Sequence, residues 1–144
     1  MHKEQVRRFY EEIWNMNNKA IISSVLLESF TFRGSLGQET QGYRGFLEYV
    51  DSVHNALGDY RCTINEIVSE GKQVFAKVTF CGIHRGELMG FFPTQHIVSW
   101  VGCALFTFQG NRISDAWILG DLQGLETQLR RNAQKLVAKQ GSGL

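Results

Sequence analysis

Three side chains in this sequence belong to types that transfer protons or stabilise negative charge: Asp121, His84 and Arg33. Asp121 stands where an apolar strand pattern, WILG, meets a helical pattern, LQGLETQL. A carboxyl group at such a junction serves either as a helix N-cap or, among apolar groups that raise its pKa, as an acid/base group. Strand alternation puts Asp121 on the same face as Trp117 and Leu119, and we predict that this is the inner face.

His84 and Arg33 are the candidates for stabilising an oxyanion. His84 ends an alternating apolar stretch and precedes a glycine-containing loop, which predicts an imidazole at the wall or rim of a cavity. The alternative for His84 is a structural bond to the backbone. Arg33 ends a short strand beside Gly34, and its forked guanidinium suits a carbonyl, carboxylate or enolate oxygen. The alternative for Arg33 is an ion pair with Glu39, Glu48 or Asp51, or with Asp121 itself.

Aromatic and large apolar side chains would form the walls of such a site. Aromatic residues at helical or alternating spacing belong mostly to a core, and the same rings can fill the interior completely. The residues that we predict to bind a substrate are Trp14, Phe46, Phe80, Phe92, Trp100, Trp117 and Leu119. Flat apolar walls suit a planar or polycyclic ligand. The connection 85–95 carries Met89, Phe91 and Phe92 between glycines, which is typical of a mobile lid or of a packed hairpin loop.

Helical and alternating patterns along the chain predict an α+β domain. Apolar residues recur at helical spacing from Val6 to Trp14, and helices are expected over about 19–28 and 43–57. A short strand at 30–33 and long strands over about 61–68, 74–84, 96–108 and 112–120 precede a C-terminal helix. We expect a cone-shaped, curved antiparallel or mixed β-sheet with N-terminal helices on its concave face. A single domain would cover residues 1–140, followed by a disordered tail at 141–144.

Alternation in the long strands separates two faces of this sheet. The inner face is predicted to carry Val74, Ala76, Val78, Phe80, Gly82 and His84 on one strand and Val98, Trp100, Gly102, Ala104 and Phe106 on the next. The outer face is also apolar, because it carries Phe75, Cys81, Ile83, Ile97, Val101, Cys103 and Leu105. A patch of this kind on a soluble protein usually meets a partner. We predict a homodimer through the outer face.

Composition excludes several classes of function. Fifteen basic and fourteen acidic side chains give a net charge of +1 without long runs of one sign, so nucleic acid and anionic membranes are not expected partners. Three cysteines without CxxC spacing, and a beginning without a secretory signal, predict a cytoplasmic protein. No histidine and carboxylate spacing suits a metal, and no phosphate-binding glycine motif follows a strand. We therefore expect neither a metal nor a cofactor.

Several motifs in fixed order resemble the SnoaL-like polyketide cyclases of the nuclear transport factor 2-like superfamily. They are FYEEIWN at 9–15, GYRGF at 42–46, HRGELMG at 84–90 and WILGDLQGLETQL at 117–129. The resemblance implies a cone-shaped α+β barrel around an apolar pocket, in which an aldol cyclisation proceeds without metal or cofactor. It also implies that Asp121 is the acid/base group. Arg33 stands where many members carry a histidine.

These observations predict a cofactor-independent enzyme that transfers a proton on an apolar carbonyl compound, by aldol cyclisation or isomerisation. Asp121 would take and return the proton, and His84 or Arg33 would steady the oxyanion. Two alternatives stay open: a dimeric protein that binds a hydrophobic small molecule without chemistry, and a hydrolase or dehydratase on the same fold.

Overall fold

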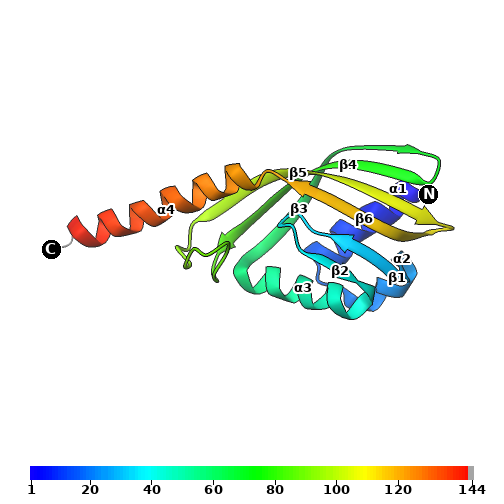
Figure 1. Ribbon diagram of the computed structural model, residues 1–144, viewed down its shortest axis with the longest axis horizontal. Coiled ribbons are helices and arrows are strands. Elements are labelled where there is room, and N and C mark those ends of the chain that lie inside the picture. The colour runs from blue at the N-terminus through cyan, green and yellow to red at the C-terminus, as the bar shows by residue number, and fades with distance from the viewer. Residues whose placement is uncertain (143–144) are drawn as a thin grey trace.

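The computed structural model describes residues 1–142 and has the α+β architecture expected from the sequence (Figure 1). Its first half is helical except for two short strands: α1 (His2–Arg8), the π-helix η1 (Phe9–Asn15), the 3₁₀ turn η2 (Lys19–Ile21), α2 (Ile22–Val25), β1 (Leu26–Arg33), β2 (Glu39–Gln41) and α3 (Gly42–Ala56). Its second half contains the long strands β3 (Leu57–Glu70), β4 (Gln73–His84), β5 (Ile97–Gln109) and β6 (Arg112–Gly120), and then α4 (Leu122–Ser142).

The six strands form one sheet in the order β2-β1-β6-β5-β4-β3. β1 runs parallel to β6, and the other neighbours are antiparallel. The helix expected over 19–28 ends at Val25, because Leu26 already pairs with Ile113 on β6. Figure 1 shows α3 lying along one side of the curved sheet. The interior of the cone therefore lies between the sheet and the N-terminal helices.

Aromatic side chains from the helices pack against the inner face of the sheet. Phe9 of η1 lies 5.3 Å from Phe106 of β5 and 5.7 Å from Phe46 of α3, measured between ring centroids. The alternation predicted for β4 and β5 is confirmed, since every even-numbered residue from Val74 to His84 and from Val98 to Phe106 is buried. Close packing of rings on this face supplies most of the core.

The inward orientation predicted for residues 117, 119 and 121 is wrong, because β6 contains a β-bulge. Phe108 pairs with Ile113, whereas Thr107 pairs with Asp115, so β6 has one extra residue at this point. An extra residue turns every following side chain to the opposite face. Beyond the bulge the buried residues are Ala116 and Ile118. Trp117 is 44% exposed and Leu119 is 52% exposed, both on the outer face.

Helix α4 is attached to the sheet by its first half. Leu125 and Leu129 are fully buried, and the Gln128 side chain both donates to the Ser99 carbonyl at 2.6 Å and accepts from the Ser99 N–H at 3.0 Å. β6 ends at Gly120 opposite Gly102, so it cannot pair with the backbone of Ser99 farther along β5. The amide of Gln128 thus replaces a strand at this edge of β5.

The second half of α4 extends away from the sheet (Figure 1). The helix continues to Ser142 and thus includes residues 141 and 142 of the expected tail. Residues 143–144 of the expected tail lie outside the described part of the chain. Over residues 1–142, none of the helices is long and apolar enough to span a membrane.

Replacing Gln128 with alanine should lower the free energy of unfolding by about 1 kcal/mol, because both backbone groups of Ser99 lose their protein partner. The control is Gln123→Ala, an exposed glutamine in the same helix, which should change stability by less than about 0.5 kcal/mol. Urea denaturation followed by circular dichroism measures both values. Equal effects of the two substitutions would contradict the role of Gln128 at the edge of β5.

Candidate functional site

The interior of the cone contains a small cavity between the sheet and the helices. Its volume is about 10 Å³, and its lining residues are Trp14, Phe32, Ser35, Tyr49, Tyr60, Cys62, Phe80 and Ile118. A volume of this size holds about one water molecule. Aromatic side chains thus fill most of the interior described by residues 1–142, and this cavity is far smaller than the enclosed pocket of ligand size expected from the sequence.

The polar groups of the cavity are neutral hydrogen-bond donors. Burial raises the pKa of the Cys62 thiol to about 12 and that of the Tyr49 hydroxyl to about 12 as well. Burial likewise holds the pKa of Tyr60 well above its usual value, and Tyr60 is hydrogen-bonded to Cys62. These groups stay protonated at neutral pH. They suit a carbonyl or enolate oxygen, and Cys62 is not activated as a nucleophile.

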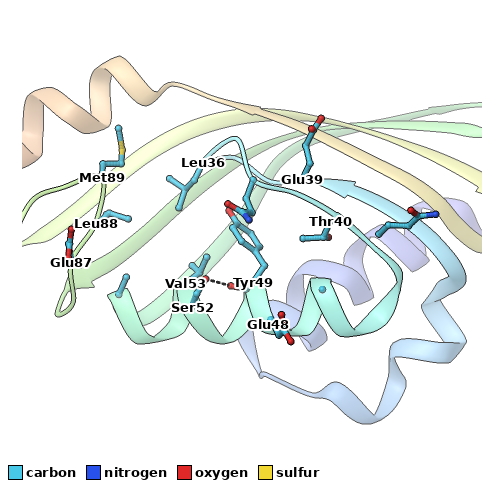
Figure 2. Close-up of a pocket in the computed structure, with 14 residues that line it drawn as sticks. Leu36, Glu39, Thr40, Glu48, Tyr49, Ser52, Val53, Glu87, Leu88 and Met89 are labelled. Carbon is cyan, nitrogen blue, oxygen red and sulfur yellow. Dashed lines mark hydrogen bonds between the residues drawn. The ribbon is translucent and has the colours of Figure 1, made fainter.

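Tyr49 separates this cavity from a larger groove at the mouth of the cone. The groove has a volume of about 610 Å³ and is lined by residues of α3, of the segment 36–41 and of the connection at 87–89. Figure 2 shows the Tyr49 ring rising from α3 toward the segment that carries Leu36. Gly34 lies against the Tyr49 ring, since a Cβ atom at position 34 would come within 2.8 Å of three ring and hydroxyl atoms. Tyr49 and residues 34–36 therefore form the wall between groove and cavity.

The groove itself does not gather its carboxylates at one point. Glu39, Glu48 and Glu87 belong to its lining, yet in Figure 2 their side chains point in different directions. Glu48 also pairs with Arg44 at 3.4 Å. The groove thus offers space and mixed polarity rather than an acid cluster.

Asp121 lies outside the cone and caps a helix. Its side chain is exposed, and its Oδ1 atom accepts a hydrogen bond from the Gly124 N–H at 3.0 Å. Its own N–H donates to the Val101 carbonyl at 2.8 Å. The N-cap interpretation is therefore confirmed. The expected apolar surroundings of this carboxyl group are absent because the bulge in β6 turns position 121 outward.

His84 anchors the connection 85–95. The side chain is fully buried, its Nε2 atom lies 3.1 Å from the Phe91 carbonyl, and it lines neither the cavity nor the groove. Burial lowers the pKa of His84, against the smaller effect of backbone hydrogen bonds. This position fits the alternative in which His84 is a structural residue that bonds to the backbone.

Arg33 lies on the outer side of the sheet. Its guanidinium donates to the Ile118 carbonyl and stacks over the Trp117 ring at 5.3 Å. None of the ion pairs considered for Arg33 forms within the described residues: Glu48 pairs with Arg44, Asp51 pairs with Lys19 at 2.6 Å, and neither Glu39 nor Asp121 pairs with Arg33. Arg33, His84 and Asp121 thus occupy three separate places and do not form one site.

The residues predicted to bind a substrate divide into three groups. Trp14 and Phe80 line the cavity, and Trp100 packs against Phe80 with 5.4 Å between ring centroids. Phe46 is a core ring. Phe92 is 80% exposed, and Trp117 and Leu119 also lie on the surface.

The sequence analysis missed Ser35, Tyr49, Tyr60 and Cys62 as site residues. Tyr60 and Cys62 are two residues apart on β3 and therefore share a face, which was a usable signal. Ser35 carried no such signal, because it lies in a glycine-marked loop.

Another residue that the sequence did not single out, His54, packs behind two walls of the cavity without lining it. Its ring stacks on Trp14 at 6.0 Å and meets Tyr60 edge-on at 5.9 Å. Its Nε2 atom is buried and has no hydrogen-bond partner within residues 1–142. Burial lowers the pKa of His54, and the Trp14 backbone and Asp51 only partly oppose this effect. The neutral imidazole is the form that accepts a proton.

Stability should fall as the pH drops below about 6.5, the ordinary pKa of histidine. The unfolded chain then takes up protons that His84 and His54 resist in the folded state, so protonation favours unfolding. The variant His84→Gln should show a flatter decline of unfolding free energy between pH 7 and pH 5, measured by urea denaturation. The same slope in both proteins would show that His84 titrates normally when folded.

Comparison with known proteins places this geometry in a family. A model of the SnoaL-like polyketide cyclases matches residues 4–129. A candidate polyketide cyclase from Acidithiobacillus ferrooxidans superimposes with a TM-score of 0.79 at 24% identity, over 91% of this chain and 95% of that one. A SnoaL-like polyketide cyclase from Agrobacterium tumefaciens gives a TM-score of 0.76 at 15% identity, over 90% and 98% of the two chains.

A third solved structure has a ketosteroid isomerase-like fold. This protein from Catenulispora acidiphila, in complex with trimethylamine, gives a TM-score of 0.72 at 14% identity, over 85% of this chain and 88% of that one. At such identities these structures establish the shared fold. A comparison with curated protein sequences gives no match. Because the family model spans most of the chain, the protein belongs to the SnoaL-like polyketide cyclase family.

Proposed function

We propose that this protein is a cofactor-independent enzyme of the cyclase or isomerase type that transfers a proton on an apolar carbonyl compound. Membership of the family supports the reaction class. The observation that carries the proposal is the set of neutral donors, Tyr49, Tyr60 and Cys62, around an interior whose other lining residues are mostly aromatic. Such donors bind a carbonyl oxygen and strengthen their bonds as it becomes an enolate oxygen.

The substrate would enter through the groove and displace the wall formed by Tyr49 and residues 34–36. The groove, at about 610 Å³, falls in the size range of small-molecule sites, whereas the cavity alone holds about one water molecule. The carbonyl end would occupy the cavity, and the rest of the molecule would remain in the groove. Exclusion of water from the aromatic interior strengthens each hydrogen bond to the developing charge.

His54 takes the place of Asp121 as the proposed proton acceptor. It contacts the cavity walls Trp14 and Tyr60 and is neutral near pH 7, whereas Asp121 is an exposed cap on the other side of β6. A proton taken from the carbon next to the carbonyl would pass to Nε2 of His54 and return to the product. The enolate oxygen formed meanwhile would be held by the protonated donors.

Exchange of α-protons tests the proposal without knowledge of the natural substrate. The protein should accelerate deuterium uptake by 1-tetralone or a related apolar ketone in D₂O, measured by proton NMR. The variant His54→Gln should slow this exchange by about 10²- to 10⁴-fold, which is the usual contribution of a general base. Asp121→Asn, which keeps a capping side chain, is the matched control and should stay within about twofold. Loss of exchange in Asp121→Asn alone would restore Asp121 as the base.

A second candidate function is binding without chemistry. It is favoured by one observation: the eight residues that line the cavity include no carboxylate and no histidine. Under this alternative, ketones bind with measurable affinity, but the rate of α-proton exchange equals that of the buffer. The exchange experiment therefore separates the two candidates.

We further propose a homodimer through the outer face of the sheet. The outer patch consists of Phe75, Cys81, Ile83, Ile97, Val101, Cys103, Leu105, Trp117 and Leu119. Register makes it continuous, because Leu105 pairs with Phe75 on one side and with Trp117 on the other. Ile97 is 69% exposed and Val101 is 46% exposed. A continuous exposed apolar surface of this kind marks a protein interface. In a twofold dimer the same surface of a second copy would cover it and remove both surfaces from water.

The variant Val101→Lys should convert the dimer to a monomer, because it would bury one ammonium group from each copy in the interface. Each charge would face either its symmetry mate or apolar side chains of the outer patch. Size-exclusion chromatography with light scattering measures the mass. Met16→Lys changes an exposed apolar residue at the end of η1, outside the outer patch; it is the control and should leave the mass unchanged. A monomeric wild-type protein at micromolar concentration would refute the homodimer.

A further inference from the structure

The indole N–H of Trp100 is a buried donor without an acceptor. Trp100 is 3% exposed, and its Nε1 atom has no hydrogen-bond partner among the described residues. The ring is fixed between neighbours, because Phe80 lies 5.4 Å away and Tyr60 lies 6.3 Å away between ring centroids. Both neighbours line the cavity. Rotation to a different partner is therefore restricted by packing.

The position of this N–H is defined by a glycine. A Cβ atom on Gly120 would lie 3.1 Å from Trp100 Nε1 and 2.7 Å from the Ser35 carbonyl oxygen. Gly120 is thus the residue that lets the backbone of β6, the indole edge and Ser35 approach one another. Ser35 lines the cavity and belongs to the wall that the substrate would displace. Movement of residues 34–36 would therefore uncover the indole N–H.

The chemistry of the indole group limits what it can bind. An indole N–H donates one hydrogen bond and cannot accept one, so its partner must be an acceptor. A buried donor left unpaired is unfavourable, and a phenylalanine would fill most of the same apolar space without this disadvantage. The surrounding rings of Phe80 and Tyr60 favour an uncharged ligand. A carbonyl oxygen on an apolar framework meets both conditions.

We propose that Trp100 donates its indole N–H to the carbonyl oxygen of the ligand and thereby selects ketones over hydrocarbons of the same shape. This inference rests on the proposed function, since it assigns the oxygen of that substrate class to a particular atom. Tyr49 and Tyr60 contribute further donors on the side of β3 and α3. Trp100 is then a specificity-determining residue, because a ligand that lacks the oxygen leaves the N–H unpaired.

Indole NMR signals test this assignment directly. The protein contains three tryptophans, and their Nε1–H signals can be assigned with Trp100→Phe and Trp117→Phe. Titration with 1-tetralone should move the Trp100 proton downfield, whereas its isostere 1-methylenetetralin should not. The signal of Trp117, which lies on the outer face, serves as the internal reference and should show no comparable shift.

Affinity provides the second measurement. Trp100→Phe should weaken binding of 1-tetralone by about tenfold or more and leave binding of the hydrocarbon isostere within about twofold, as measured by calorimetry. Trp117→Phe should affect neither ligand. An equal loss for both ligands would show that Trp100 only fills space, and would overturn the inference.

The outcomes separate this inference from the proposed function. If 1-tetralone binds and exchanges its α-protons while the Trp100 signal stays unchanged, the donor assignment is wrong and the proposed function stands. If the Trp100 signal is already at a hydrogen-bonded position and insensitive to ketone, a bound water is its partner and the assignment is again wrong. If neither 1-tetralone nor related apolar ketones bind, both proposals fail.

Discussion

The β-bulge between Ile113 and Asp115 determines which side chains of β6 can take part in a site. Before the bulge Ile113 faces the interior, and after it Ala116 and Ile118 do so. The same extra residue carries Trp117 to the outer face and leaves Asp121 exposed as the cap of α4. All charged candidates near this strand thus lie outside the cone. The interior depends on β3, α3 and η1 for its polar groups.

An interior of this composition favours uncharged hydrogen-bond donors and acceptors over ionised groups. Tyr49, Tyr60 and Cys62 are buried without a cation among the residues that line the cavity, so each keeps its proton. In an apolar site, fixed neutral donors stabilise an enolate without the desolvation penalty of a buried ammonium or guanidinium group. His54 is neutral for the same reason. Burial therefore sets both the donor and the acceptor properties of the proposed site.

The sequence predicted the fold better than the site, for a physical reason. Regular alternation in β4 and β5 identified both faces correctly, because each even position carries an apolar or small residue or the buried His84. In β6 both alternations were apolar, with Ile113, Trp117 and Leu119 at odd positions and Ala116 and Ile118 at even positions, so parity alone was ambiguous. The spacing of three between Ile113 and Ala116 was the signal of the bulge.

The remaining site residues depend on contacts between distant parts of the chain. His54 becomes a candidate only because α3 places it against Trp14 of η1 and Tyr60 of β3. Trp100 becomes a candidate only because Gly120 of β6 admits Ser35 beside its Nε1 atom. The contact of His54 with Trp14 and the contacts of Gly120 with Ser35 and Trp100 bring together segments that lie tens of residues apart, and no local pattern encodes them. The close approach of Gly120, Ser35 and Trp100 links the wall at 34–36 to the indole N–H, so in the proposed mechanism entry of a ligand and exposure of its donor would be one movement.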